Sequence, residues 1–494
     1  MDSALLLDAL QFIDDAELPL DSLTVVRHGH IVLDVYYYPY TPDRPHQLWS
    51  ATKSVTATLV GIAIDRGLID SVDQPIIELF PQFAPDEVNL AARSATVADF
   101  LAMSSGISCS STFRNECAAM DSGDATAFVA DLLFAESRPT YPPYRRFEYC
   151  DLNSCLLLGA IQNSIDKPLW QFADEVLFEP LEITNYTWWT DDVGMPLGSF
   201  GLHLTPHDMA HIGALYLNGG VWNGQRLVSQ AWVDFVRCAD PSRCPFYDAE
   251  NRTGYGYHWW LFKPSLYAAV GLGGQFIAVA PAIDMVVVVT SYGSTSEQVY
   301  ESIPYELIEG RILAAAVSDT ELPADDAVHA SLRAAVERAA MPSAAPRAPL
   351  PDIAFDVSGM SFHLLRPIHT SFWPAKHTVS VARPCALVGY GLSFMSTNEG
   401  AVTFEYEDES AMTLRAGLDG VWRVTPTDYG EWAARGSWDV DEAAFHLSTQ
   451  LVGGAERHEF VFHFADDRPI LRWIQPEALH LGATDVMRAV PREP

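Results

Sequence analysis

The chain has 494 residues, 49% hydrophobic and 19% charged, so it can bury a large core and is too apolar to be disordered. Its 64 acidic and 30 basic residues leave a formal charge of −34, which argues against nucleic acid and anionic membranes as partners. Apolar stretches such as residues 277–290 are broken by Pro281 and Asp284, so no membrane-spanning helix is predicted.

The first predicted elements are a helix and a hairpin. An amphipathic helix covers Ala4 to Asp15, and two β-rich runs, 23–27 and 31–36, flank His28-Gly29-His30, which is typical of a hairpin. The first ten residues lack the basic segment and apolar run of a signal peptide. We therefore expect a cytoplasmic protein if Met1 is the native start, and an extracytoplasmic one if a leader was removed.

Residues 50–240 are mainly helical in pattern, with loops rich in Ser, Gly and Pro. Two or three strands are predicted over 255–262 and 275–290, and a helix near 305–317. Strands at both ends of a helical stretch indicate one antiparallel sheet, flanked by helices, that receives a large helical insertion. The predicted fold class is therefore mixed α/β (α+β), with a first domain over residues 1–320.

The pattern changes beyond residue 320. A helix is predicted over 327–340, and the proline-rich stretch up to Pro351 indicates a semi-rigid linker, so residues 321–351 form the connection. Residues 352–494 alternate on a two-residue period and predict a β-rich domain, sandwich- or barrel-like. The clearest alternating runs are 402–406, 411–415, 421–424, 445–450 and 460–464.

The segment Trp49–Gly67 carries the central chemical signal. Ser50 is predicted to cap an apolar helix, and Lys53, one turn later, shares its face. A serine hydroxyl becomes a good nucleophile when a neighbouring base accepts its proton, and burial lowers the pKa of a lysine enough for that role. The helix N-terminus would help to stabilise an oxyanion formed at Ser50.

An alternative interpretation is a capping serine beside a solvated lysine. The Ser-x-x-Lys pattern is weak alone, because it recurs at Ser164 and Lys167 in a polar, helix-ending turn where we expect a structural role. Lysine is scarce, however, since the chain holds four, and a lysine within an apolar helix favours the catalytic interpretation.

Two further segments complete the candidate site. A loop carrying Tyr149 and Asp151 precedes an apolar helix, so the phenol could relay protons beside Lys53; alternatively Tyr149 packs under the helix and Asp151 caps it. Residues 271–275 (Gly-Leu-Gly-Gly-Gln) would let backbone N–H groups approach a reacting carbonyl, or form only a hairpin turn.

These three segments, in this order, resemble the serine β-lactamase and penicillin-binding superfamily. The branch looks like the class C β-lactamase-related hydrolases, which include esterases and 6-aminohexanoate-dimer hydrolases. The resemblance covers roughly residues 20–315. Four further segments also resemble the family: residues 100–106, 204–210, 215–224 and 256–260.

The resemblance implies a role for each residue. Ser50 would be the acylated nucleophile, Lys53 its general base, and Tyr149 the group that passes protons to and from the leaving group. Main-chain N–H groups of Ser50 and of a residue near Leu272 and Gly273 would form the oxyanion hole. No metal and no cofactor is expected.

Two departures from the family pattern bear on the substrate. Asp151 stands where the family's Tyr-x-Asn motif has asparagine, and Leu272-Gly273-Gly274 replaces the third motif, Lys-Thr-Gly or His-x-Gly. Without that cation, and with a charge of −34, we expect neutral or cationic small esters and amides rather than anionic penicillins. The alternatives are a β-lactamase or D-amino-acid peptidase, and a non-catalytic acyl-binding or sensor protein.

The remaining candidate groups favour structural roles. His203, His207 and His211 could suggest a metal site, but Thr205-Pro206-His207-Asp208 is typical of a helix start that leaves His203 outside. Trp188 and Trp189 could line the cleft. Cysteine pairs 109/117 and 238/244 could form disulfides or remain free thiols, beside the pair 150/155 and the single Cys385.

Overall fold

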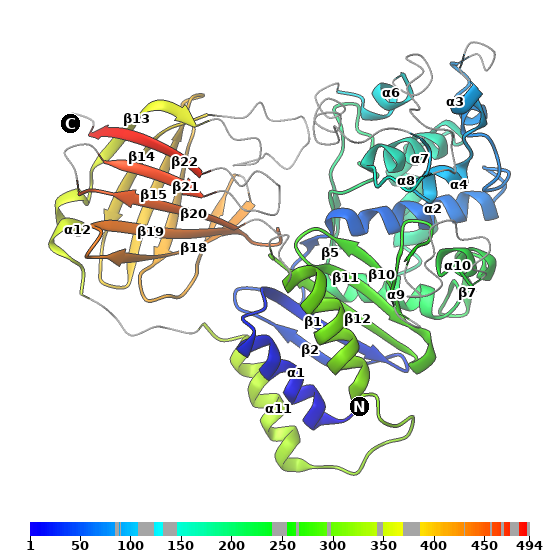
Figure 1. Ribbon diagram of the computed structural model, residues 1–494, viewed down its shortest axis with the longest axis horizontal. Coiled ribbons are helices and arrows are strands. Elements are labelled where there is room, and N and C mark those ends of the chain that lie inside the picture. Colours follow the sequence, from blue (N-terminus) through cyan, green and yellow to red (C-terminus); the bar gives the residue numbers. More distant parts are fainter. Residues whose placement is uncertain are drawn as a thin grey trace.

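The structure is a computed structural model, and its described residues form three hydrophobic cores. Two cores lie on opposite faces of a sheet in the N-terminal two thirds of the chain, and the third fills a C-terminal barrel (Figure 1). The structure describes residues 1–83, 88, 90–106, 123–131, 146–239, 254–262, 266–293, 298–342, 349–368, 386–428, 430–454, 457–465, 469–474 and 484–491.

Among the described strands, seven form an antiparallel sheet in the order β2-β1-β12-β11-β10-β9-β8. The first two strands and the last five are far apart in sequence and meet where β1 pairs with β12. Their bounds are β1 (Leu20–Arg27), β2 (His30–Tyr36), β8 (Gly254–Tyr255), β9 (Trp260–Phe262), β10 (Leu266–Gly271), β11 (Gln275–Ala280) and β12 (Met285–Ser291).

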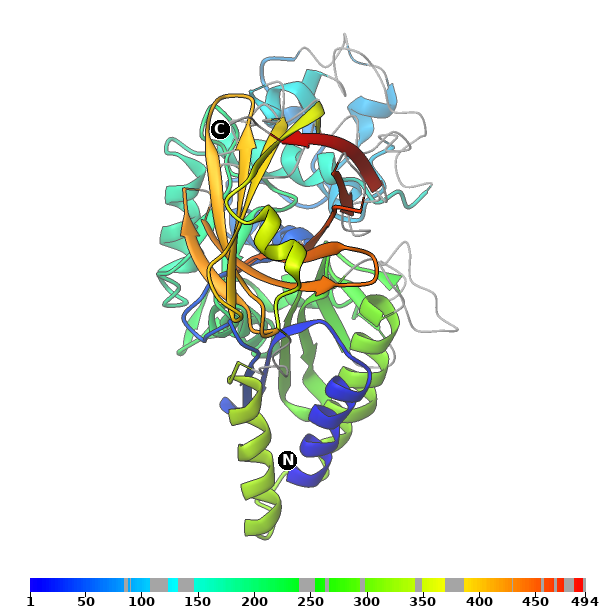
Figure 2. The same cartoon turned by 90° about the vertical axis from the view of Figure 1, so that its left-hand side faces the viewer.

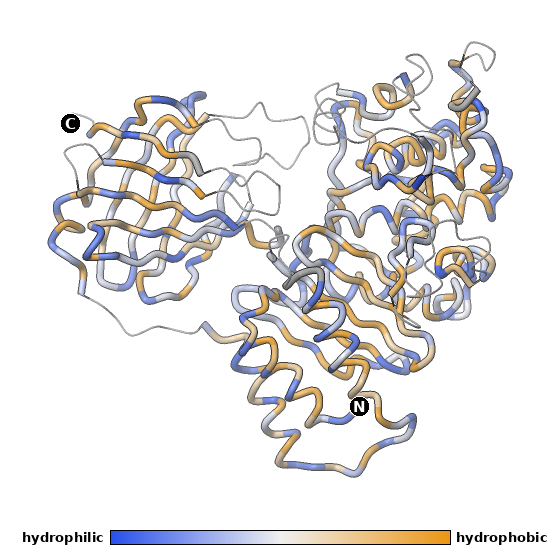
Figure 3. The backbone as a smooth tube through the Cα atoms, viewed as in Figure 1, coloured by the Kyte–Doolittle hydropathy of each residue, from blue (hydrophilic) through white to orange (hydrophobic). Residues whose placement is uncertain are grey.

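Helices cover both faces of this sheet. Val286 and Val288 of β12 pack into the core that holds α2 (Thr52–Asp65), α7 (Asp151–Asn163) and α9 (Pro206–Leu217). Val287 and Val289 point the other way, towards α1 (Ser3–Asp15), α11 (Asp326–Ala339) and η8 (Gln298–Ile312), and α1 lies beside α11 (Figure 1). Burial on both faces explains why residues 285–289 of β12 form an unbroken apolar run (Figure 3).

The helical insertion lies between β2 and β8. It holds the small sheet β3-β5-β4, whose strand β3 (His46–Gln47) leads directly into η1 (Trp49–Ala51) and α2. Its other elements are η2 (Ile76–Leu79), α3 (Leu90–Ser94), α4 (Val97–Leu101), α6 (Ala125–Ala130), α8 (Leu169–Ala173), η5 (Asp174–Phe178), β4 (Thr187–Trp188), β5 (Leu202–Leu204), β6 (Val221–Trp222), β7 (Gln225–Arg226) and α10 (Gln230–Val236).

In the described part of the C-terminal region, ten strands form one sheet that closes into a barrel where β16 pairs with β18 (Figure 2). Alternate residues fill its interior, as in β15, where Val402, Phe404 and Tyr406 are buried. Helix α12 (Asp352–Val357) precedes β13 (Ser361–Ile368), β14 (Leu387–Phe394), β15 (Glu399–Tyr406), β16 (Ala411–Gly417), β17 (Arg423–Thr427), β18 (Gly430–Asp439), β19 (Ala444–Leu451), β20 (Arg457–His463), β21 (Ile470–Ile474) and β22 (Thr484–Pro491).

The predicted fold class is confirmed: an antiparallel sheet with helices and a helical insertion, followed by a β-barrel. The sequence prediction missed strands β3 to β7, β10, β13, β14, β18, β21 and β22. The division at residues 320 and 351 stays a proposal, although α11 packs on α1 of the first domain. Among the described residues, none of the helices combines the length and apolarity that crossing a membrane requires.

Candidate active site

Ser50 lies in a strained turn at the entrance to a buried helix. It is the middle residue of η1, and Trp49 before it has a φ of +47°, which is uncommon for a bulky residue. The prediction that Ser50 caps α2 is wrong, because the residue preceding α2 is Ala51 and no side chain caps this end. The hydroxyl of Ser50 is therefore not engaged by the helix backbone.

Lys53 links Ser50 to a carboxylate. Its Nζ lies 2.9 Å from Oγ of Ser50, 3.0 Å from the carbonyl oxygen of Ser199 and 2.5 Å from Oδ1 of Asp151. The side chain is 1% exposed and that of Asp151 18% exposed. The alternative of a solvated lysine is therefore wrong, and Asp151 belongs to the same cluster. Asp151 does not cap α7 but is its first residue, after Cys150.

The expected charge state of Lys53 needs correction. Burial disfavours the charged amine, as predicted, but the neighbouring Asp151 and Tyr149 oxygens outweigh burial, so the pKa of Lys53 is raised above its ordinary value. The prediction of a lysine with a lowered pKa is wrong because it counted burial and not the adjacent carboxylate. At neutral pH Lys53 is a cation paired with Asp151.

Tyr149 completes the cluster from the loop before α7. Its ring lies beside the lysine, with Nζ of Lys53 4.9 Å from the ring centroid, and its phenol is close enough to Lys53 and Ser50 for both to act on its pKa. Burial raises the pKa of Tyr149, and the Lys53 charge offsets this only in part. The ring stacks on Trp260, with centroids 5.9 Å apart and an interplanar angle of 24°. The structure thus brings Ser50, Lys53, Tyr149 and Asp151 together.

Leu272 and Gly273 lie in the turn between β10 and β11. A Cβ built on the preceding Gly271 would lie 2.0 Å from the carbonyl oxygen of Leu48, so this strand end runs against the backbone just before Ser50. Gly273 adopts a φ of +81°, and its carbonyl accepts a hydrogen bond of 2.9 Å from the N–H of Gly293. The turn is close to the Ser50 segment, and its oxyanion role remains a prediction.

Three residues of the site had no role in the sequence prediction. The Ser199 carbonyl accepts from Lys53, Trp260 stacks on Tyr149, and His258 contacts the Lys53 backbone. Trp260 and His258 belong to the family-like segment 256–260, so the sequence did contain a pattern that pointed to them. Ser199 contributes only its backbone carbonyl, which no sequence pattern reveals. Burial lowers the pKa of His258 to about 3, so its imidazole is neutral and cannot supply charge.

The other groups that the sequence suggested make contacts of their own. Ser164 hydrogen-bonds to the carbonyl of Ala160, and Lys167 pairs with Glu175 near the surface, in keeping with a structural role. Trp188 contacts Phe178, whereas Trp189 packs on Phe200 beside Trp49.

The three histidines have different neighbours. Thr205 and Asp208 form the predicted capping box of α9, and His203 lies in β5. His207 pairs with Asp34, and His211 packs on Trp222. Among the described residues, ligand atoms close enough to hold a metal ion come from Asp439, Glu442 and His446 of the barrel, which are not neighbours of Ser50.

The cysteines are resolved in part. Cys150 and Cys238 each take part in a disulfide, and Cys155 is a free thiol on α7. Cys109, Cys117, Cys244 and Cys385 lie outside the described residues. Burial raises the pKa of Cys155 to about 12, so this thiol stays protonated.

A sheet with a helical insertion and a Ser-x-x-Lys pair at a buried helix define the class of β-lactamase-fold hydrolases. The sequence profile of the Beta-lactamase family matches residues 11–310, more than half of the chain, and the protein belongs to this family. It is 25% identical to the 6-aminohexanoate-dimer hydrolase of Paenarthrobacter ureafaciens over 284 residues, 54% of this chain and 71% of that protein.

Solved structures agree on the fold. A provisionally assigned 6-aminohexanoate-dimer hydrolase from Bacillus anthracis matches 62% of this chain and 80% of its own, with a TM-score of 0.51 at 20% identity. EstCE1, a hydrolase with promiscuous acyltransferase activity, matches 64% of this chain and 99% of its own, with a TM-score of 0.51 at 14% identity.

Proposed function

We propose that this protein is a serine hydrolase that cleaves ester or amide bonds through an acyl-enzyme on Ser50. The observation that carries the proposal is the 2.9 Å contact between Oγ of Ser50 and Nζ of a fully buried lysine. A hydroxyl held beside a charge-bearing group at a helix entrance is the arrangement that nucleophilic catalysis uses. Membership of the Beta-lactamase family supports it.

The raised pKa values of Lys53 and Tyr149 determine the proton inventory. At neutral pH both Lys53 and Tyr149 are protonated, so neither can accept the Ser50 proton. The active base is therefore the Lys53–Tyr149 pair after it has lost one proton. Such a coupled pair titrates as a unit. Lys53 then supplies the positive charge that stabilises a phenolate on Tyr149, and this oxygen accepts the Ser50 proton.

The reaction then takes two steps. Oγ of Ser50 bonds to the substrate carbonyl carbon, and the pair returns the proton to the leaving alcohol or amine as its bond to that carbon breaks. Water attacks the acyl-enzyme with the same proton transfers and releases the acid. Backbone N–H groups of Ser50 and Leu272 are proposed to hold the oxyanion. No cofactor or metal takes part in this scheme.

We further propose neutral or cationic small substrates. The sequence at 272–274 has no cation to pair with a substrate carboxylate, and the charge of −34 opposes anionic ligands. Phe147, Tyr149, Tyr255 and Trp260 form an aromatic wall beside Ser50 that suits an uncharged group. The hydrolase from Paenarthrobacter ureafaciens, named for 6-aminohexanoate dimers, suggests that amides belong in the panel.

The test is a substrate panel of p-nitrophenyl esters, amides and nitrocefin. Ser50→Ala should abolish turnover and covalent labelling by a fluorophosphonate, seen by mass spectrometry, without changing the circular dichroism spectrum. Ser164→Ala, in the second copy of the motif, is the matched control and should keep wild-type activity. Turnover surviving Ser50→Ala would refute the proposal. Faster turnover of nitrocefin than of esters would instead favour a β-lactamase, and an unlabelled wild type a non-catalytic protein.

A further inference from the structure

One hairpin of the C-terminal barrel contacts the catalytic domain at both halves of the candidate active site. Strands β19 and β20 form this hairpin, and Gln450 and Arg457 stand opposite each other at its end. Gln450, Arg457 and the turn residue Gly453 all contact residues of the catalytic domain. We call the segment from Gln450 to Arg457, as far as it is described, the docking hairpin.

The first contact joins the hairpin to the strand that precedes the nucleophile. The Gly453 carbonyl accepts a hydrogen bond of 2.6 Å from the N–H of Gln47, the last residue of β3 and three residues before Ser50. Gly453 has a φ of +87°, and a Cβ there would lie 2.5 Å from the Pro45 carbonyl oxygen. Only glycine fits this close approach without displacement of one backbone by the other.

The second contact is a buried polar network behind the same strand. Nε2 of Gln450 lies 2.6 Å from the Tyr40 hydroxyl and 3.5 Å from Oδ1 of Asp21. Oδ2 of Asp21 lies 2.9 Å from Nε2 of His46, the other residue of β3. Asp21, His46 and Gln450 are each at most 2% exposed. Polar groups buried this deeply are costly without hydrogen-bond partners, so replacing Gln450 would disturb the position of β3.

The third contact reaches the other half of the site. The Arg457 guanidinium lies 5.5 Å from the ring centroid of Tyr292 and 3.5 Å from its hydroxyl. Next to Tyr292, the N–H of Gly293 donates a 2.9 Å hydrogen bond to the carbonyl of Gly273, in the turn proposed to hold the oxyanion. The docking hairpin is therefore connected to both the nucleophile segment and the oxyanion turn.

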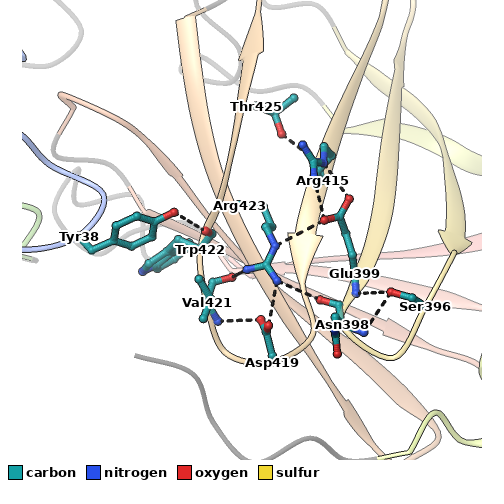
Figure 4. A network of polar contacts seen from close by, with 10 residues as sticks. All are labelled: Tyr38, Ser396, Asn398, Glu399, Arg415, Asp419, Val421, Trp422, Arg423 and Thr425. Atoms are coloured by element: carbon teal, nitrogen blue, oxygen red, sulfur yellow. Dashed lines mark hydrogen bonds and ion pairs between the residues drawn. The ribbon is translucent and has the colours of Figure 1, made fainter. Parts of the chain in front are cut away.

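Further polar contacts around the docking hairpin join the barrel to the catalytic domain. The Tyr38 hydroxyl donates to the carbonyl of Trp422 at 3.2 Å, next to the Arg423 network with Asp419 and Glu399 (Figure 4). Arg44 and Glu431 form an ion pair of 2.9 Å across the same junction. The hairpin thus sits at the centre of a junction with further polar contacts around it.

From these contacts we propose that the docking hairpin positions the active site, with Gly453 as the principal positioning residue. The inference rests on the proposed function of Ser50. β3 is two residues long, pairs with β5 and is followed by Trp49 in a strained conformation, so the contact with Gly453 adds a constraint from the barrel to the segment that leads to Ser50. In this proposal the catalytic unit is the whole chain rather than its first domain.

The test compares two glycine substitutions in the full-length protein. Gly453→Ala meets the Pro45 carbonyl, whereas Gly359→Ala, in the same barrel, has a φ of +83° and open space around it. Both substitutions place an alanine in a left-handed backbone conformation, which is unfavourable. Only Gly453→Ala also brings a Cβ against the segment that leads to Ser50. The readouts are the fluorophosphonate-titrated fraction of active sites, the kcat per titrated site, KM and the melting temperature.

Gly453→Ala should lower kcat per active site by about ten- to a hundredfold, as expected for misplacement of a nucleophile, with KM changed less than about twofold. Gly359→Ala should match wild type per site. A purely structural role of Gly453 would lower the titrated fraction and leave kcat per site unchanged, and that result would overturn the inference.

Gln450→Leu provides a second route if Gly453→Ala does not fold. It removes the bonds to Tyr40 and Asp21 while leaving the turn backbone intact. It should also lower kcat per site, by about tenfold. Wild-type kcat per site in this variant would overturn the inference. A wild-type protein that fluorophosphonate does not label would overturn the proposed function itself, which separates the two failures.

Discussion

Oδ1 of Asp151 lies 2.5 Å from Nζ of Lys53, and the same Nζ lies 2.9 Å from Oγ of Ser50. One buried amine therefore serves both a carboxylate and the candidate nucleophile. The carboxylate stabilises the ammonium form, whereas a base must be able to lose a proton. In the proposed mechanism Asp151 would therefore set the pH at which the Lys53–Tyr149 pair becomes active, and it stands where the family motif has asparagine.

The first prediction concerns the pH profile of Asp151→Asn. Asp151 raises the pKa values of both Lys53 and Tyr149, so removing its charge should lower both. Since the pair works after losing a proton, kcat/KM should rise with pH in wild type, and the rising limb should move to lower pH in the variant. On that limb one pH unit corresponds to about a tenfold change in rate.

The measurement is kcat/KM for a p-nitrophenyl ester across the pH range in which both proteins remain folded. Asp166→Asn, next to the surface pair of Lys167, is the matched control and should leave the limb in place. A limb that stays in place or moves to higher pH in Asp151→Asn would show that Asp151 does not control the base.

The second prediction uses the same pair to test stability. Lys53→Met leaves the Asp151 carboxylate without its cation in a largely buried place, and should lower the free energy of unfolding by about 3 kcal/mol. The double variant Lys53→Met/Asp151→Asn removes both charges and should recover most of this loss. Urea unfolding gives the values. Both variants should be inactive, so recovered stability without recovered activity separates folding from catalysis. Equal stability of the single and double variants would speak against a tight pair.

The sequence predicted the fold well where burial has a regular period. Alternation in 402–406 and 445–450 identified barrel strands, the apolar spacing of α2 identified that helix, and the capping residues Thr205 and Asp208 identified the start of α9. β10 was missed because it is buried, small-residue sequence without alternation, and β18 because Gly436 and charged residues interrupt its pattern. Such segments become strands because they pair with neighbouring strands of the sheet, and the local sequence does not reveal that pairing.

At the candidate site, the spacing of Ser50 and Lys53 predicted a local pair, since one helical turn relates them. The sign of the Lys53 pKa shift could not be predicted, because it depends on the distance to Asp151, which only the folded chain determines. The stack of Tyr149 on Trp260 likewise joins segments that meet through the sheet. The Ser199 carbonyl is a backbone group that any residue could provide.

The third prediction concerns this aromatic stack. Trp260→Leu removes the ring that lies 5.9 Å from the Tyr149 ring, so the phenol should lose its fixed orientation towards Ser50. We expect kcat to fall by about tenfold for an activated ester, since proton transfer depends on geometry. Trp170→Leu, at a surface tryptophan that is 49% exposed, is the control and should retain wild-type kcat. Unchanged kcat in Trp260→Leu would show that the stack does not orient Tyr149.

The fourth prediction tests the assignment of the nucleophile against the free thiol nearby. Cys155 lies on α7, one turn after Asp151; the residue is 9% exposed, and burial raises the pKa of its thiol to about 12. Since the thiolate is the reactive form, iodoacetamide at pH 8 should leave Cys155 unmodified in the folded protein and alkylate it in guanidinium. Peptide mass spectrometry reads both states. Iodoacetamide treatment of the folded protein should also leave esterase activity intact. Alkylation of Cys155 in step with loss of activity would point to the thiol rather than Ser50 as the reacting group.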